Sequence, residues 1–209
     1  SKLLEIKVTR ETRQKIEIQA RYTHVPPGSS IGFSYSKTYE IFSNGTVELT
    51  TSVEPAGTLP PLPRLGFILQ LPLAFNDFSW YGRGPHENYI DRNTSANIGM
   101  YENFVEEMLT NYIVPQENGN RTDIRWAELA SNHIALRVES NRPIETSVSH
   151  YSIWELTNAR HTSELRKGKM VYWNIDYRQG GLGGQSCGPP PIEKYLFHPQ
   201  ALSFKLIFT

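Results

Sequence analysis

Strict alternation of apolar and polar residues recurs along almost the whole chain of 209 residues. In one segment Ile16, Ile18, Ala20 and Tyr22 alternate with charged or amide side chains. A period of two is typical of a β-strand with one solvated face. The same pattern predicts roughly ten strands, the clearest of which lie at 4–8, 16–22, 31–35, 39–42, 47–49, 65–71, 134–138, 144–148, 171–177 and 202–208.

Turn and helix signals complete the fold prediction. The pair Asn44-Gly45 between two β-prone runs predicts a hairpin closed by a type I′ turn. Helical signal is limited to 103–109 and to 153–159, where Ser152 and Glu155 have the spacing of a capping box. An eight-fold α/β barrel needs about 250 residues and eight helices, so it is excluded. We expect an antiparallel all-β domain, either a sandwich or a barrel.

One proline-rich segment interrupts the alternation. Residues 54–63 include Pro55, Pro60, Pro61 and Pro63. Proline lacks a backbone N–H donor and fixes its φ angle, so this segment is expected to be a stiff connection between sheets or half-domains. The chain both starts and stops in a predicted strand, which suggests a domain excised from a longer protein.

Charge and cysteine content exclude several classes of protein. There are 21 Lys and Arg residues against 21 Asp and Glu residues, without a run of like charge. The basic surface of a nucleic-acid-binding or membrane-surface protein is therefore missing. A single Cys forms neither an internal disulfide nor a multi-thiolate zinc site. No segment approaches the roughly 18 consecutive apolar residues of a transmembrane helix, which indicates a soluble chain.

Four segments, at 80–92, 112–126, 149–161 and 174–189, are dense in polar and aromatic residues. Carboxylates, amides, guanidinium groups and flat aromatic rings together suit a sugar-binding cleft, because sugar hydroxyls need fixed donors and acceptors and a pyranose face needs an aromatic platform. The alternative interpretation is structural. In an all-β fold, an Arg–carboxylate pair near a turn is more often a brace between loops.

Other chemistries lack their sequence signals. The glycines at 82–84 are not followed by Gly-Lys-Ser/Thr, so a phosphate loop is not predicted. His86, His150 and His161 lack metal-ligand spacing, and a Gly-x-Ser-x-Gly elbow is absent. Cys187 has no basic neighbour in sequence, which favours a small half-buried thiol over a nucleophile.

The four polar segments resemble one family in order and in detail. They read Trp-Tyr-Gly-Arg-Gly-Pro-His-Glu-Asn-Tyr-x-Asp-Arg at 80–92, Pro-Gln-Glu-Asn-Gly-x-Arg-Thr-Asp-x-Arg-Trp at 115–126, Ser-His-Tyr at 149–151 with Ala-Arg-His at 159–161, and Asn-Ile-Asp at 174–176 leading to Gly-Gly at 183–184. This resembles the C-terminal domain, or small chain, of the large β-galactosidases of glycoside hydrolase family 2. The match runs from about Lys37 to Thr209, and the first strands fit more loosely.

The resemblance implies a galactose-mutarotase-like antiparallel supersandwich in which residues 1–209 are one domain of a much longer enzyme. In that family the two catalytic glutamates of a retaining hydrolysis belong to a separate α/β-barrel domain. The resemblance therefore implies no catalytic residue, metal or cofactor in this chain, and the magnesium and sodium sites of such enzymes lie in other domains. Its implied partners are the rest of the β-galactosidase chain, a galactoside substrate and further copies of the enzyme, with no nucleic acid and no membrane.

The resemblance also implies a loop near the substrate, formed by Gly183, Gly184, Gln185, Ser186 and Cys187. Family members commonly carry a Trp at the position of Cys187, where the ring forms a wall of the sugar site. A Cys side chain does not stack on a pyranose. Either another domain supplies the platform or the substrate preference differs.

On the concave sheet face of such a fold, the remaining polar residues are expected to line a groove that binds sugar or to brace one another, with bracing favoured. They are Arg64, Trp80, Glu87, Asn88, Arg92, Glu117, Asn118, Arg121, Asp123, Arg125, His150 and Asp176. Two further hypotheses stay open. The chain is an aldose mutarotase or epimerase, in which His150 acts with Glu117 or Asp176 as acid and base, or it is a free-standing carbohydrate-binding module.

Overall fold

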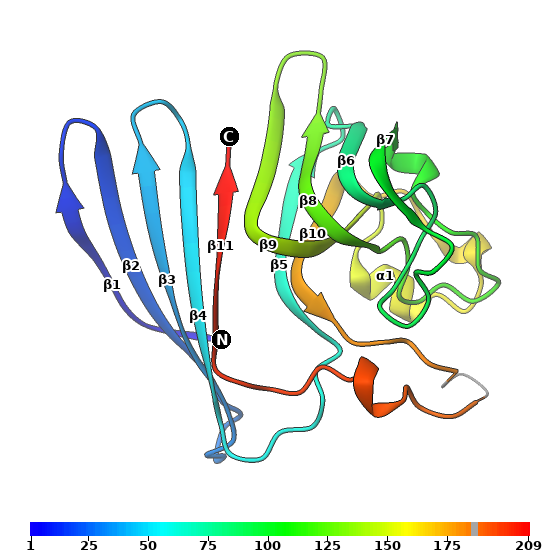
Figure 1. The fold of residues 1–209 in the computed structure, drawn as a ribbon, viewed down its shortest axis with the longest axis horizontal. Coiled ribbons are helices and arrows are strands. Elements are labelled where there is room, and N and C mark those ends of the chain that lie inside the picture. Colours follow the sequence, from blue (N-terminus) through cyan, green and yellow to red (C-terminus); the bar gives the residue numbers. More distant parts are fainter. Residues whose placement is uncertain (185–187) are drawn as a thin grey trace. The chain divides into compact units, whose positions relative to one another are not determined.

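The computed structural model describes residues 1–184 and 188–209 (Figure 1). These residues form two compact units. The first contains Ser1–Leu62, Val138–Arg142 and His198–Thr209, and the second contains Pro63–Arg137 and Pro143–Phe197. The division after Leu62 falls inside the proline-rich segment, as expected for a connection between half-domains.

The sheet of the first unit has the order β1, β2, β3, β4, β11 and part of β9. Each pair of neighbours in it is antiparallel. In Figure 1 the first four strands run from blue to cyan and β11 is red. The bounds are β1 Lys2–Glu11, β2 Lys15–His24, β3 Gly32–Phe42, β4 Val47–Ala56, β9 Ala135–Ser149 and β11 Leu202–Phe208.

The strand register sorts the side chains of this sheet by polarity. One face carries Ala20, Leu49 and Phe204, each of which is buried. On the opposite face the Lys205 ammonium lies 2.6 Å from the Glu48 carboxylate. The alternation seen in the sequence thus becomes one apolar face and one charged face.

The second unit orders its strands β5, β10, β9, β8, β6 and β7. Its elements are β5 Arg64–Pro72, β6 Asp77–Gly84, β7 Asn97–Phe104, β8 Arg121–Ala130, the later part of β9, β10 Met170–Gln179, the helix α1 Ile153–Asn158 and the 3₁₀ turns η1 Val105–Glu107, η2 Thr162–Glu164 and η3 Glu193–Tyr195. None of the helices among the described residues is long and apolar enough to cross a membrane.

Aromatic residues form the core of the second unit. Phe78 stacks on Trp80 with ring centroids 5.4 Å apart and meets Trp173 edge-on at 6.1 Å. The Trp173 indole is fully buried, and its Nε1 donates to the Thr146 hydroxyl at 2.9 Å. A buried indole N–H without a partner would be costly, so this bond fixes the ring between β9 and β10.

The predicted all-β, antiparallel class is confirmed, but the strand prediction missed β6, β7 and β8 and divided two other strands. Predicted strands at 31–35 and 39–42 belong to one strand, β3, and those at 134–138 and 144–148 belong to β9. The segment 103–109 contains the end of β7 and one 3₁₀ turn, η1. The apolar residues Val105 and Met108 of this segment are buried although only one 3₁₀ turn forms there.

The hairpin at Asn44-Gly45 is confirmed, but its type I′ turn is wrong. Strands β3 and β4 pair from Ile41 opposite Val47. The turn is closed by a bond from Gly45 N to Phe42 O at 3.0 Å, and Gly45 alone has a positive φ, of 92°. Because this register leaves more than two connecting residues, Gly45 follows the turn rather than forming its centre.

The capping box at the start of α1 is confirmed. The Ser152 hydroxyl accepts from Glu155 N at 3.1 Å, and the Glu155 carboxylate accepts from Ser152 N at 2.6 Å. Two otherwise unpaired N–H groups of this six-residue helix are thereby satisfied.

Ser152→Ala is expected to destabilise the second unit by about 1 kcal/mol, because one cap bond is lost. The midpoint of urea unfolding, followed by tryptophan fluorescence, measures this change. Ser163→Ala, an exposed serine in η2, is the matched control and should leave the midpoint unchanged. Equal midpoints for both variants would contradict the capping role.

Candidate functional site

Arg64, the first residue of β5, joins two carboxylates of the second unit. Its Nη1 lies 3.2 Å from Glu117 Oε2 and its Nε lies 3.3 Å from Asp176 Oδ1, while its Nη2 also binds Asp176. The Asp176 side chain is only 3% exposed. Burial raises the pKa of Asp176, and the charge of Arg64 opposes that rise. The guanidinium thus compensates a carboxylate that is removed from water.

A glycine makes room for this ion pair. Gly66 lies opposite Asp176 in the pairing of β5 with β10. A Cβ atom at Gly66 would lie 2.2 Å from Asp176 Oδ1 and 2.4 Å from the Ile175 carbonyl oxygen. Any side chain at this position would therefore push the carboxylate away from Arg64.

Glu87 organises a second cluster. Its carboxylate accepts from Gly119 N at 2.6 Å and also binds Arg92 and the Tyr112 hydroxyl. The Tyr89 hydroxyl lies 3.4 Å from both Glu87 Oε2 and Glu117 Oε1. Tyr89 therefore connects the Glu87 cluster to the Arg64 cluster, and burial raises its pKa well above the ordinary value.

Two buried amides hold loops of the second unit, and one of them, Asn88, bonds to strand β8. Asn88 accepts from the Thr122 backbone N at 2.9 Å and from the Thr122 hydroxyl at 2.6 Å, and it donates to the His86 carbonyl at 2.9 Å. Asn118 bonds both to N and to O of Thr110, at 2.8 and 2.7 Å. Each side-chain amide both donates and accepts a hydrogen bond, so neither its NH₂ group nor its oxygen is buried without a partner.

Glu145 is a buried carboxylate with neutral hydrogen-bond partners. Its Oε2 accepts from Asn120 at 2.7 Å and its Oε1 accepts from Gln179 N at 3.2 Å. The Gln179 amide in turn donates to Asp176 at 3.3 Å, which links Glu145 to the Arg64 cluster. Burial raises the pKa of Glu145 to about 7, against the lowering effect of these hydrogen bonds.

Arg121 and Trp80 lie together at another edge of the same network. Arg121 donates to the carbonyls of Gly119 at 2.7 Å and of Pro85 at 3.0 Å, and its guanidinium lies 5.4 Å from the centre of a Trp80 ring. Burial lowers the pKa of Arg121 to about 10. The cation therefore braces two loops over the aromatic core.

Asp123 and Arg125 lie on β8 and have their own partners. The Asp123 carboxylate accepts from Arg83 Nε at 2.6 Å, and its φ of 56° is a left-handed value. Arg125 donates to the Asp123 carbonyl and lies 5.6 Å from the centre of the Tyr81 ring. Both residues take part in local pairs rather than in the Arg64 or Glu87 cluster.

His150 lies apart from the carboxylates proposed as its catalytic partners. It follows Ser149, which pairs with Tyr172, whereas Asp176 pairs with Glu145. Five residues, or about 16 Å of extended chain, separate His150 from Glu145, the residue opposite Asp176. Both ring nitrogens of His150 are buried without a hydrogen-bond partner among the described residues, and burial lowers its pKa. The described residues therefore do not assemble the acid–base pair of a mutarotase.

Gly183 and Gly184 of the predicted substrate-proximal loop are described. Gly183 N donates to Asp91 Oδ2 at 2.7 Å, and Gly184 N donates to the Pro189 carbonyl at 3.1 Å. Gln185, Ser186 and Cys187 lie outside the described residues, so the role predicted for them stays a prediction.

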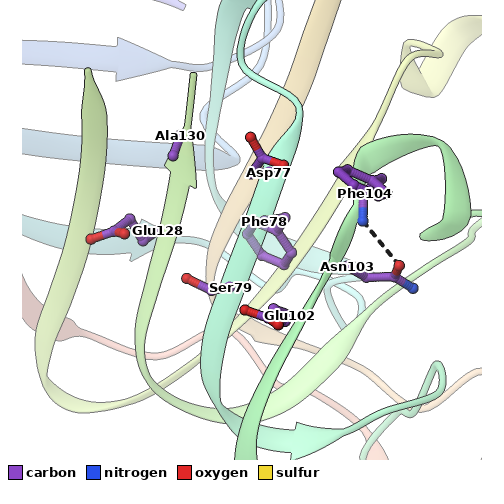
Figure 2. Close-up of a pocket in the computed structure, with 8 residues that line it drawn as sticks. All are labelled: Asp77, Phe78, Ser79, Glu102, Asn103, Phe104, Glu128 and Ala130. Atoms are coloured by element: carbon purple, nitrogen blue, oxygen red, sulfur yellow. Dashed lines mark hydrogen bonds between the residues drawn. The ribbon is translucent and has the colours of Figure 1, made fainter. Parts of the chain in front are cut away.

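Two open hollows border the second unit. One, of about 620 Å³, is lined by His86, Glu87, Arg92, Thr94, Ser95, Thr110 and Tyr112. The other, of about 500 Å³, exposes the carboxylates of Asp77, Glu102 and Glu128 beside Ser79 and Phe104 (Figure 2). In the described part of the chain no group of three or more His, Cys, Asp or Glu residues is placed to hold a metal ion. Only the first hollow contains predicted site residues, Glu87 and Arg92, and sugar binding there stays a prediction.

The family of this chain follows from comparison with known proteins. A family model described as "Beta galactosidase small chain" matches residues 1–208. The chain belongs to the β-galactosidase small-chain family. It is similar to the β-galactosidases of Vibrio cholerae, 46% identical over 164 residues, and of Halalkalibacterium halodurans, 35% identical over 185 residues. These alignments cover 78% and 87% of this chain but only 15% and 17% of the relatives.

Two solved structures are also similar to this small chain. A GalM/aldose epimerase homologue from C. elegans aligns with 98% of the chain and 67% of its own length, at 8% identity and a TM-score of 0.48. A putative aldose 1-epimerase from Escherichia coli K12 aligns over the same shares at 12% identity and a TM-score of 0.41.

Several residues that take part in these hydrogen bonds were not named by the sequence analysis. Four of them lie inside the polar segments, so the motifs indicated their regions: Tyr89, Asp91, Tyr112 and Asn120. Glu145 carried no such signal, because it alternates with Ile144 and Thr146 as a residue of a solvated strand face would. The structure buries 144–148 on both faces, which only the full sheet order reveals.

Arg64→Gln is expected to destabilise the second unit by about 3–5 kcal/mol, because Asp176 is left buried without its cation. Thermal unfolding monitored by near-UV circular dichroism measures the loss. Arg13→Gln, on an exposed turn of the first unit, is the matched control. An unchanged transition for Arg64→Gln would show that the ion pair is not required.

Stability is expected to fall between about pH 4.5 and pH 7. Glu145 keeps its proton in the folded state to about pH 7, whereas the unfolded side chain loses it near pH 4.5. In this range the folded state binds more protons, so raising the pH favours unfolding. The raised pKa values of Asp176 and Glu117 act with the same sign.

Glu145→Gln removes one of these titrations and should reduce the slope of urea-unfolding free energy against pH. Glu102→Gln, at an exposed position of β7 in the same unit, is the control and should keep the slope. The same slope in Glu145→Gln and in the unaltered protein would refute the assignment.

Proposed function

We propose that this chain is the non-catalytic C-terminal domain of a β-galactosidase that hydrolyses terminal β-galactosides. The observation that carries this proposal is the family match over residues 1–208, together with relatives of which the chain covers only 14 to 17%. In this proposal the remaining five-sixths of the enzyme contain the catalytic carboxyl groups.

The arrangement of the carboxylates supports a non-catalytic role. A retaining glycosidase needs two carboxyl groups about 5–5.5 Å apart on either side of the sugar, one to donate a proton and one to attack. Here Glu87, Glu117 and Asp176 are held by Arg92 and Arg64, and Glu145 accepts bonds from buried amides. Carboxylates that are already saturated with partners are suited to holding loops in place.

In the proposed enzyme the loop Gly183–Pro189 forms one wall of the active site, and the domain supports association with the rest of the chain and with further subunits. Magnesium and sodium, where the enzyme needs them, bind in other domains. The galactoside contacts this domain at the loop. The network of the second unit holds the segments 85–92 and 110–120 so that the loop has a fixed support.

Complementation tests the proposal. The rest of the parent enzyme and this chain are produced separately, and hydrolysis of o-nitrophenyl β-galactoside is measured for each alone and for their mixture. Activity is expected only in the mixture. Replacing this chain by its Arg64→Gln variant should lower the recovered activity, whereas the Arg13→Gln variant should not. Hydrolysis by this chain alone, or full activity of the remainder alone, would overturn the proposal.

A further inference from the structure

The chain contains two Asn-Gly pairs, Asn44-Gly45 and Asn118-Gly119. In such a pair the backbone nitrogen of the glycine can attack the side-chain carboxamide of the asparagine. A five-membered ring results, and glycine has no Cβ atom that would obstruct the approach. The same reactive sequence therefore occurs twice in one molecule, and its surroundings decide whether each copy reacts.

The first pair is open to solvent. Asn44 and Gly45 are both exposed, and a Cβ atom at Gly45 would meet no other atom within 4 Å. They lie in the connection between β3 and β4, beyond the last pair of these strands, Ile41 opposite Val47. Water and hydroxide therefore reach the nucleophile, Gly45 N, and the leaving group, the amide nitrogen of Asn44.

A hydrogen bond prepares the Asn44 side chain for this attack. Thr46 N donates to Asn44 Oδ1 at 3.0 Å. A side chain that accepts from the backbone two residues ahead is folded toward the intervening peptide, here that of Gly45. The same N–H draws electron density from the carboxamide carbon and stabilises the oxyanion that forms when Gly45 N adds to it. The turn thus supplies a nucleophile, an electrophile and a donor to the oxyanion.

One contact opposes the reaction at Asn44. Gly45 N donates to the Phe42 carbonyl at 3.0 Å, and this bond must open before the nitrogen can attack. A single neutral hydrogen bond lowers the reactive fraction by about tenfold. The exposed turn therefore slows the attack on Asn44 without preventing it.

The second pair is held by three hydrogen bonds. Asn118 is 8% exposed, and its side chain both accepts from Thr110 N at 2.8 Å and donates to the Thr110 carbonyl at 2.7 Å. Gly119 N donates to the Glu87 carboxylate at 2.6 Å. Both the carboxamide and the nucleophile are therefore fixed, and attack requires a local opening that breaks all three bonds together.

We propose that Asn44 is a site of spontaneous deamidation and isomerisation, and that its hydrogen bonds protect Asn118 from the same reaction. Gly45 N loses its proton to hydroxide and forms a bond to Asn44 Cγ, while the Cγ–Nδ2 bond breaks and ammonia leaves. Water then opens the succinimide, at Cγ to give aspartate or at the main-chain carbonyl to give isoaspartate. The inference goes beyond the proposed function and does not rest on it.

The modification changes the hairpin in two ways. The imide nitrogen of the succinimide carries no proton, so the bond from Gly45 N to the Phe42 carbonyl is lost. Isoaspartate then adds one carbon atom to the main chain between β3 and β4. Both products also add a negative charge to a chain that has no formal net charge, so ion-exchange chromatography separates them as acidic species.

The experiment uses the full-length protein, incubated in its folded state. Peptide-resolved mass spectrometry follows the loss of the side-chain amide at Asn44 and Asn118, and electron-transfer fragmentation distinguishes isoaspartate from aspartate. The rate at Asn44 should exceed that at Asn118 by at least about 100-fold, since one hydrogen bond must open at the first pair and three at the second. In concentrated urea the two rates should become similar, because these bonds are then absent.

Two variants identify the source of the acidic species. Asn44→Ser keeps a hydroxyl oxygen that can accept from Thr46 N but has no carboxamide, so the rapidly formed acidic species should disappear. Asn132→Ser, in the exposed turn between β8 and β9, is the control and should leave them unchanged, because a His follows Asn132. If Asn44→Ser fails to fold, the two rates in the unaltered protein decide the outcome.

Each outcome either supports or overturns the proposal. Absence of aspartate and isoaspartate at position 44 would overturn it. Equal rates at Asn44 and Asn118 in the folded protein would overturn the protection of Asn118. A difference that persists in urea would show that sequence rather than structure separates the two pairs, which also overturns it. Rapid reaction at Asn44 alone in the folded protein, and at both pairs in urea, supports the proposal.

Discussion

The second unit depends on the neutralisation of buried carboxylates. Asp176 and Glu117 share Arg64, and Glu87 shares Arg92 with Tyr112. Each carboxylate would destabilise the fold if it were buried alone, since desolvation of an ion is costly. Because their partners come from distant segments, the requirement for pairing also determines how these segments meet. The ion pairs and hydrogen bonds of these carboxylates thus help to position the loops around 85–92 and 110–120. The aromatic core of the same unit is held by side-chain packing.

The same residues gave the sequence its most specific motifs. In isolation, a run such as Pro-His-Glu-Asn-Tyr suggested either a sugar cleft or a structural brace. The structure shows that Glu87 and Asn88 already bind protein groups on several sides. Their chemistry is therefore directed inward, toward other loops. A motif dense in polar residues can therefore mark contacts between loops as well as a catalytic centre.

Alternation predicted most of the strands, because burying one face of a sheet imposes a period of two, but it missed β6, β7 and β8. It was insufficient where both faces of a strand are buried. Glu145 has the pattern of a surface residue, yet β10 and the residues around Asn120 enclose it. Likewise, Asn44-Gly45 predicted a hairpin but not its turn type, since the register is decided by the whole of β3 and β4. The pairing of Asp91 with Gly183 joins residues 92 positions apart, beyond the reach of any local signal.

Strand β11 completes the sheet of the first unit by pairing with β4 on one side and with β9 on the other. In this pairing Phe208 lies opposite Val47, which precedes it by 161 positions in the chain. During synthesis, β4 therefore presents an open hydrogen-bonding edge throughout the time in which the second unit is made. An edge of this kind invites pairing with other chains. Pairing with β11 covers this edge of β4.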